Sequence, residues 1–215
     1  MKLSELSLRS GASVPTLKYW MREGILPPGV LRNQTTAVYD ERHRERVALI
    51  RTLREDFDLP IVRIRRLVSL IDDPGVPLLD VMQECQLIAV GLAPGGDGDD
   101  SAPVMAVIRD LGWPDAASIA RDALASALDD AARAGVPFST ETLTAYGRAL
   151  APFAAADIAV IHPEGSRDAV ARGLLRGAAA QARVLLAMNQ LAHTSEAIRR
   201  TRGRGPAPAS PSADD

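Results

Sequence analysis

The chain has 215 residues, of which 47% are hydrophobic and 24% are charged. This composition is typical of a globular protein that buries a core without metals or disulfides. No window of about 18 residues lacks a charge, and the single Cys85 cannot form an intramolecular disulfide, so we exclude a bilayer-spanning or disulfide-stapled protein. The N-terminal segment MKLSELSLRS carries Glu5 where a signal peptide would be apolar, so we expect a cytoplasmic protein.

Charge is unevenly distributed along the chain. Residues 1–71 hold 13 basic and 8 acidic side chains, a net charge of +5, whereas residues 72–215 hold 12 basic and 19 acidic ones, a net charge of −7. The boundary falls where a helical pattern gives way to the turn-forming sequence DDPG. This asymmetry predicts a basic head that binds a polyanion and an acidic body; two merely solvated surfaces are the alternative.

The first ten residues of the head predict a short helix. Ser4 is the expected N-cap, and Leu3 and Leu8 are spaced as a hydrophobic staple. Gly11 suits the left-handed conformation in which many helices end. A second helix is expected almost at once, because Ser13 is a good N-cap and the following Val-Pro places a proline in the first turn.

The two short helices together predict a helix-turn-helix, a motif whose second helix enters the DNA major groove. The residues expected on the exposed face of that second helix are Thr16, Lys18, Tyr19 and Arg22. Their hydroxyl, ammonium, phenol and guanidinium groups can all bond phosphate oxygens, and Thr16 near the helix start is placed to reach a base edge.

A hairpin and two further helices are expected in the rest of the head. The segment ILPPGVLRNQTTAVY combines a Pro-Pro-Gly turn with strand-forming residues, which predicts a small β-hairpin, or wing. Asp40 is expected to cap a helix that runs to about Asp56, and Pro60 to open another. For each arginine on these helices, a solvated helix face is the alternative to a phosphate contact. The arginines are Arg42, Arg44, Arg46, Arg51, Arg54, Arg63, Arg65 and Arg66.

The order of these features resembles the DNA-binding domain of the MerR family of bacterial transcription regulators. The likeness covers about residues 3–71 and lies in SGASVPTLKYWMREGILPP, VYDERHRERVALIRTLRE and LPIVRIRRLV. It implies a winged helix-turn-helix that dimerises, binds a near-palindromic operator within a promoter and distorts the DNA for RNA polymerase. The DNA contacts implied are Ser13, Thr16, Lys18, Tyr19, Arg22, Arg32, Tyr39, Arg42, Arg63 and Arg65.

The chain departs from the family pattern at two places. Near the end of the wing, Thr36 and Ala37 stand where the family usually has an aromatic residue followed by arginine. In the second helix, Trp20 replaces the usual second tyrosine. Because tryptophan is mostly buried in proteins, Trp20 either packs into the core or faces the DNA.

Beyond the head we expect an all-α body, so that the whole fold is mainly α with a winged helix-turn-helix followed by a separate helical part. Residues 72–103 are expected to hold a short dimerisation helix, 78–92, and an acidic Gly-rich linker; a helix this short predicts that dimerisation needs additional surface. The body itself should span residues 104–200, with helices at 104–111, 116–134, 139–161 and 166–200. Residues 201–215 are rich in Pro, Ser, Ala and Gly and should be disordered.

A small-molecule effector site in the body would use its aromatic and polar side chains. The candidates are Trp113, Phe138, Tyr146, Phe153, His162, Gln181, Met188 and Asn189, although simple packing in the alanine-rich bundle is the alternative for each. Metal sensing is not expected, because a lone cysteine cannot supply three or four soft ligands, and we expect no cofactor.

No catalytic motif is present: the sequence lacks GxSxG, GxxxxGK[ST] and HExxH, so we do not expect an enzyme. Two other classes stay open from the sequence. One is an architectural or excisionase-like DNA-bending protein without an effector. The other is an enzyme or antitoxin-like protein whose head is an adaptor.

Overall fold

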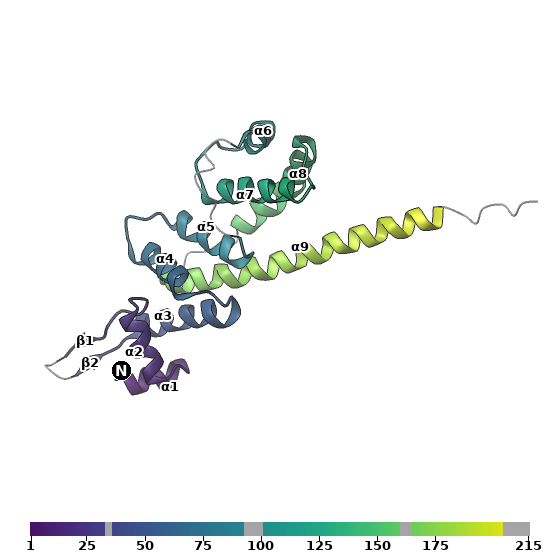
Figure 1. Ribbon diagram of the computed structural model, residues 1–215. Coiled ribbons are helices and arrows are strands. Elements are labelled where there is room, and N and C mark those ends of the chain that lie inside the picture. Colours follow the sequence, from purple (N-terminus) through teal and green to yellow (C-terminus); the bar gives the residue numbers. More distant parts are fainter. Residues whose placement is uncertain (33–35, 93–100, 160–164, 204–215) are drawn as a thin grey trace, which may run out of the picture.

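The computed structural model describes residues 1–32, 36–92, 101–159 and 165–203. It confirms a mainly helical fold with one small hairpin near the N-terminus (Figure 1). The head contains α1 (Leu3–Ser10), α2 (Val14–Arg22), β1 (Val30–Leu31), β2 (Ala37–Val38), α3 (Glu41–Arg51), a π-helical turn (Thr52–Asp56) and α4 (Ile61–Asp72). The body contains α5 (Leu78–Ala89), α6 (Ala102–Leu111), α7 (Ile119–Arg133), α8 (Thr140–Ala159) and α9 (Arg167–Gly203).

The turn between α1 and α2 forms as predicted. Gly11 ends α1 with a φ of 70°, and the Ser13 hydroxyl accepts a hydrogen bond from the Thr16 amide at 3.2 Å, which caps α2. The predicted start of α1 is wrong. Lys2 occupies the N-cap position without a side-chain bond, because Leu3 already lies in the first turn and packs against the core. The predicted staple is also wrong, since Leu8 is 84% exposed.

The hairpin leads directly into α3. Its strands pair antiparallel, with Val30 opposite Val38 and Leu31 opposite Ala37. Asp40 then caps α3 as predicted: its carboxylate accepts a hydrogen bond from the His43 amide at 3.3 Å, and the Asp40 amide donates to the His43 ring in return. The hydrogen bond with the His43 side chain lowers the pKa of Asp40.

A single hydrophobic core joins the head to two helices of the body. Leu17 on α2 and Leu49 on α3 belong to the same buried cluster as Cys85 on α5 and Leu175 on α9. The beginning of α9 is therefore part of the head's core, which differs from the expectation of a separate body beginning at residue 104. The contact between α3 and α9 joins segments more than one hundred residues apart in the sequence. No pattern among neighbouring residues predicts it.

The body's helices follow the predicted segments closely. The helix α6 begins at Ala102, because Pro103 fits the first turn, and α9 continues to Gly203, three residues into the expected tail. The remaining linker residues 93–100 and the tail beyond 203 lie outside the described residues. Within the part of the chain that the structure describes, no helix is both long and apolar enough to cross a membrane.

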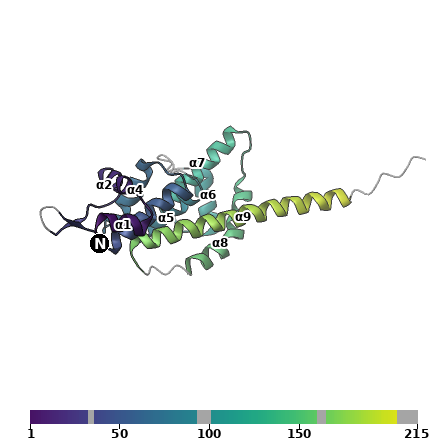
Figure 2. The same ribbon diagram turned by 90° about the horizontal axis from the view of Figure 1, so that it is seen from below.

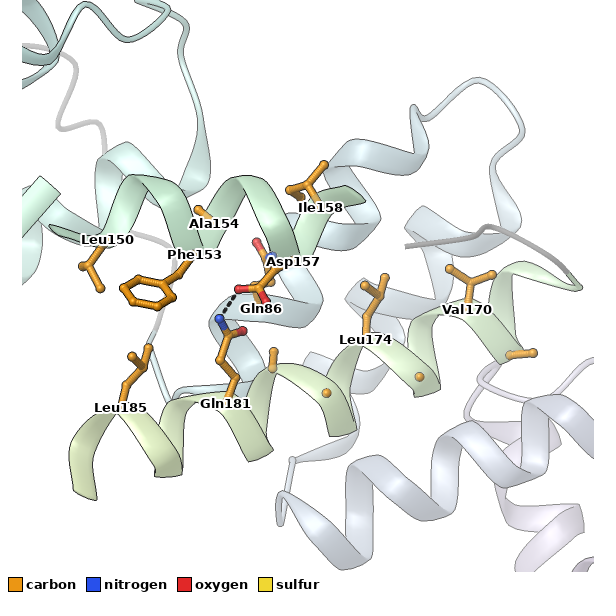
Figure 3. A pocket seen from close by; sticks show the side chains of 14 residues that line it. Gln86, Leu150, Phe153, Ala154, Asp157, Ile158, Val170, Leu174, Gln181 and Leu185 are labelled. Atoms are coloured by element: carbon orange, nitrogen blue, oxygen red, sulfur yellow. Dashed lines mark hydrogen bonds between the residues drawn. The ribbon is translucent and has the colours of Figure 1, made fainter. Parts of the chain in front are cut away.

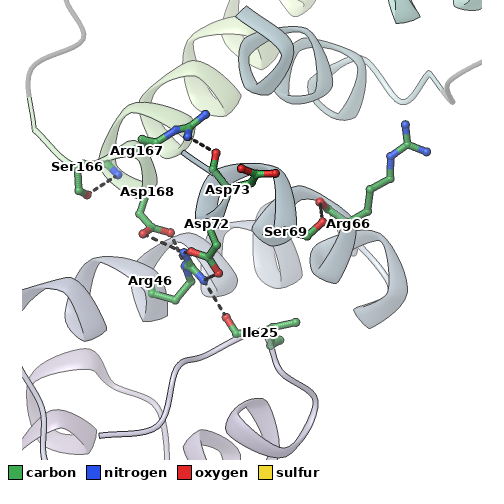
Figure 4. Close-up of polar contacts among 10 residues, drawn as sticks. Ile25, Arg46, Arg66, Ser69, Asp72, Asp73, Ser166, Arg167 and Asp168 are labelled. Atoms are coloured by element: carbon green, nitrogen blue, oxygen red, sulfur yellow. Dashed lines mark hydrogen bonds and ion pairs between the residues drawn. The ribbon is translucent and has the colours of Figure 1, made fainter. Parts of the chain in front are cut away.

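A buried arginine fixes the head against the start of α9 (Figure 4). Arg46 on α3 is almost fully buried and lies 2.5 Å from carboxylate oxygens of both Asp72, at the end of α4, and Asp168, in the first turn of α9. Its guanidinium also donates to the carbonyl of Ile25, just after α2, at 3.5 Å. Burial raises the pKa of Asp168, and the Arg46 guanidinium opposes that shift. We call these four residues the Arg46 cluster.

Removing Arg46 should destabilise the whole fold. We expect Arg46→Ala to lower the free energy of unfolding by roughly 3–5 kcal/mol, because it leaves the buried Asp168 carboxylate without its counter-charge. Urea denaturation followed by circular dichroism measures this. Arg44→Ala is the matched control on the same helix: Arg44 forms an ion pair with the exposed Glu41, so its loss should change the free energy of unfolding far less than the loss of Arg46. Equal effects of the two substitutions would contradict the role assigned to the Arg46 cluster.

Candidate nucleic-acid interface

The helix α2 presents a polar face to solvent because its apolar side chains are buried. Leu17 and Trp20 point into the core, and Trp20 is only 7% exposed, which decides between the two alternatives for this residue. Lys18 and Arg22 are exposed on the other side. The Arg22 guanidinium lies 5.3 Å from the centroid of the Tyr19 ring, a cation–π distance, so the two side chains form one surface.

The N-terminus of α2 carries the remaining two predicted contacts on this helix. The Ser13 and Thr16 hydroxyls lie 2.7 Å apart, and Ser13 also accepts from the Thr16 amide. Both hydroxyls therefore serve the helix cap, and Ser13 is exposed. The first turn of α2 also offers backbone N–H groups, which favour an anionic ligand such as phosphate.

Two of the predicted phosphate contacts on α4 are already engaged within the chain. Arg65 donates to the backbone carbonyl of Glu23 at 3.0 Å and to its carboxylate at 2.9 Å, which ties α4 to the end of α2. Arg63 is half-buried and faces the Glu84 carboxylate of α5 at 3.5 Å. Arg65 thus holds α4 against the end of α2 and Arg63 faces α5, whereas Arg42 is exposed and forms no ion pair with any described residue.

The wing places its two predicted contacts differently. Arg32 is exposed, next to the hairpin turn. Tyr39 is buried, with 6% of its surface exposed, its hydroxyl 3.8 Å from the Met21 sulfur and its ring edge-on to His43. A Cβ added at Gly29 would lie 2.8 Å from the Tyr39 ring, so the glycine allows this close approach. Tyr39 therefore packs beneath the hairpin in this structure, and its contact with DNA stays a prediction.

The predicted effector residues do not form one cluster. Phe153 on α8 and Gln181 on α9 face a common groove, whereas Tyr146 packs against Phe138 at 6.5 Å between ring centroids. Trp113 lies against α8 beside Gly147. Met188 and Asn189 are exposed on α9 outside that groove, and His162 lies outside the described residues.

Sequence reasoning missed most of the residues that line the groove between α8 and α9. Asp157, Leu150 and Leu174 lie there, together with Gly173 and Gly177. The small residues at positions 169, 173 and 177 recur every four residues, which places them on one face of a helix. That spacing, and a lone acidic residue in the apolar end of α8, are the signals in the sequence that point to the groove.

A buried acidic residue and a buried thiol lie side by side on α5. Glu84 is fully buried, and its carboxylate is 3.5 Å from Arg63 and 3.6 Å from Arg66, without a hydrogen bond from any described residue. Burial, reinforced by the charge of Glu84, raises the pKa of the neighbouring Cys85 to about 12. Among the described residues, no group of three or more His, Cys, Asp or Glu side chains is placed to hold a metal ion.

A capped helix-turn-helix with a basic exposed face, next to a two-stranded wing, defines a DNA-binding regulator of the winged helix-turn-helix class. Comparison with known families makes the assignment more specific. Residues 1–70 match the family described as MerR HTH family regulatory protein. The head is therefore a MerR-type regulatory domain, as predicted.

A solved structure resembles nearly the whole chain. It is the crystal structure of a candidate transcriptional regulator, SCO5550, from Streptomyces coelicolor A3(2). The two proteins are 28% identical, the match covers 93% of this chain and 97% of that one, and the TM-score is 0.58. Curated proteins gave no significant match. The match to SCO5550 extends beyond the head and through the body.

The environment of Cys85 makes a testable prediction about its reactivity. With a pKa of about 12, only about one thiol in ten thousand is ionised at pH 8, and the thiolate is the reactive form. We expect native protein to be unlabelled by a disulfide reagent such as Ellman's reagent over minutes at pH 8. The same protein in concentrated urea should release one equivalent of chromophore. Rapid labelling of the native state would show that α5 opens from the core.

Proposed function

We propose that this MerR-type regulator binds a near-palindromic operator within a promoter as a homodimer and distorts the DNA to control its use by RNA polymerase. The observation that carries the proposal is the exposed face of α2, where Lys18, Tyr19 and Arg22 lie together. Arg32 on the wing and Arg42 at the start of α3 add two exposed cations to the same domain. The protein acts in the cytoplasm, where promoter DNA and polymerase are found.

Dimerisation is supported by an apolar surface that the chain itself leaves uncovered. The predicted dimerisation helix, α5, packs against α4 and α9, and its buried face includes Val81 and Ile88. The far half of α9 instead projects beyond the other helices, as both Figure 1 and Figure 2 show. Met188 and Leu191 are exposed there on one side of the helix, so this half of α9 offers the additional surface that a dimer needs.

We further propose that the helical body binds a small-molecule effector that changes the affinity of the head for DNA. The groove between α8 and α9 supports this, because it contains two of the residues expected to contact an effector, Phe153 and Gln181. An architectural DNA-binding protein without an effector has no need of such a groove.

The DNA-binding proposal is tested on α2. An operator is selected from genomic fragments with the full-length protein, and binding is measured by fluorescence anisotropy across a salt series. We expect Lys18→Ala and Arg22→Ala each to weaken binding by about 1–3 kcal/mol where the side chain reads a base. A side chain that contacts only phosphate should instead weaken all sequences equally and reduce the salt slope by about one.

The matched control for these substitutions is Arg109→Ala, which removes an exposed arginine of α6 in the body. It should leave operator affinity and the salt slope unchanged. Circular dichroism and thermal denaturation establish that each variant is folded. Unaltered operator affinity in both folded α2 variants would rule out this face as the DNA-reading surface.

A further inference from the structure

The groove between α5, α8 and α9 has the size and lining of a small-molecule site. Its volume is about 800 Å³, within the range of known ligand pockets. Figure 3 shows that side chains of α8 and α9 face each other across it. The apolar lining residues are Leu150, Phe153, Ile158, Val170, Leu174 and Leu185.

Glycines on α9 make the groove deep. Gly173 and Gly177 lie one helical turn apart on the face of α9 that lines the groove. A Cβ added at either position would meet no atom within 4 Å. The space above them is therefore open, although glycine is unfavourable inside a helix by about 1 kcal/mol relative to alanine. Larger side chains would be tolerated by the fold, but they would occupy this space.

The polar groups in the groove are rich in acceptors. Asp157 is the one charged side chain among the lining residues, all of which the structure describes. The Gln181 side-chain nitrogen donates a hydrogen bond to one oxygen of the Asp157 carboxylate, drawn as a dashed line in Figure 3. The second Asp157 oxygen and the Gln181 amide oxygen are then left as acceptors. A bound molecule can thus donate hydrogen bonds to these oxygens, and a positive charge would complement the carboxylate.

We propose that this groove binds an amphiphilic amine: a small molecule with an extended apolar body and a protonated amino group that pairs with Asp157. This inference rests on the proposed effector response and specifies the chemistry of the effector. The apolar body lies along Phe153 and Leu174, over the space left by Gly177. The ammonium group lies at the Asp157–Gln181 pair, where it replaces water as the donor.

The position of the groove connects it to the head. Ala169 and Val170 line the groove, and they directly follow Asp168, which belongs to the Arg46 cluster. A molecule seated between α8 and α9 therefore contacts the first two turns of α9 beside the ion pair that fixes α9 to α3. Binding of the amine is expected to change operator affinity through this helix.

The test uses dansylcadaverine, a fluorescent probe with an aromatic body, a five-carbon chain and a terminal ammonium group. Its emission increases and shifts to the blue in apolar surroundings. N-acetyl-dansylcadaverine has the same body without the charge and serves as the matched ligand. Full-length protein is titrated into each probe at low protein concentration, and a parallel titration measures operator affinity with and without a saturating amount of the amine.

Three variants separate the parts of the site. Asp157→Asn should weaken binding of the amine about tenfold and change binding of the acetylated probe less than twofold. Gly177→Leu fills the open space and should abolish binding of both probes, while the fold is retained because leucine is a good helix former. Asp129→Asn, which removes an exposed carboxylate of α7 outside the groove, should change neither.

The outcomes distinguish this proposal from the proposed function. Binding of the amine that Asp157→Asn and Gly177→Leu reduce as stated, with a shift in operator affinity, supports the groove as an amine site. Operator binding without any probe binding overturns the amine site and leaves the regulator intact. Probe binding without a selectable operator supports the site and contradicts the proposed operator function. If Gly177→Leu instead converts a dimer to a monomer and no probe binds, a second copy occupies the groove and the amine site is overturned.

Discussion

The geometry of this protein depends on one buried guanidinium. Arg46 extends from α3 into the space where α4 ends and α9 begins, and it also reaches the chain just after α2. A buried cation is costly unless nearly all of its donors are paired, so the three segments that supply its partners have little freedom to move independently. The hydrophobic core shared by α2, α3, α5 and α9 joins the same parts of the chain. Head and body are consequently one mechanical unit at this end of the molecule.

The sequence predicted those structural features that depend on residues close together in the chain. The caps at Ser13 and Asp40, the left-handed Gly11 and the helical segments of the body are all set within a few residues, and all were found. What the sequence did not show has a physical cause as well. The burial of Tyr39 depends on Gly29, ten residues away, and on Met21 in α2. The groove was missed because it forms between helices whose relative positions depend on contacts far apart in the sequence.

The basic residues of the head fall into two groups in the structure. Several arginines are paired internally: Arg51 with Glu55, Arg65 with Glu23, and Arg46 with two aspartates. These internal ion pairs stabilise the domain. Lys18, Arg22, Arg32 and Arg42 are exposed and form no ion pair with any described residue, so they leave positive charge on the surface of the head. The net charge of the head alone did not separate these two groups.

The length of α9 has a mechanical consequence. Its 37 residues make a rod of about 55 Å, held at its first turn by the Arg46 cluster and projecting at the other end. A tilt of about 5° at the held end would displace the far end sideways by about 5 Å. Small adjustments near the head are thereby amplified into a larger sideways movement of the far end, and a constraint applied at the far end returns to the head as a torque.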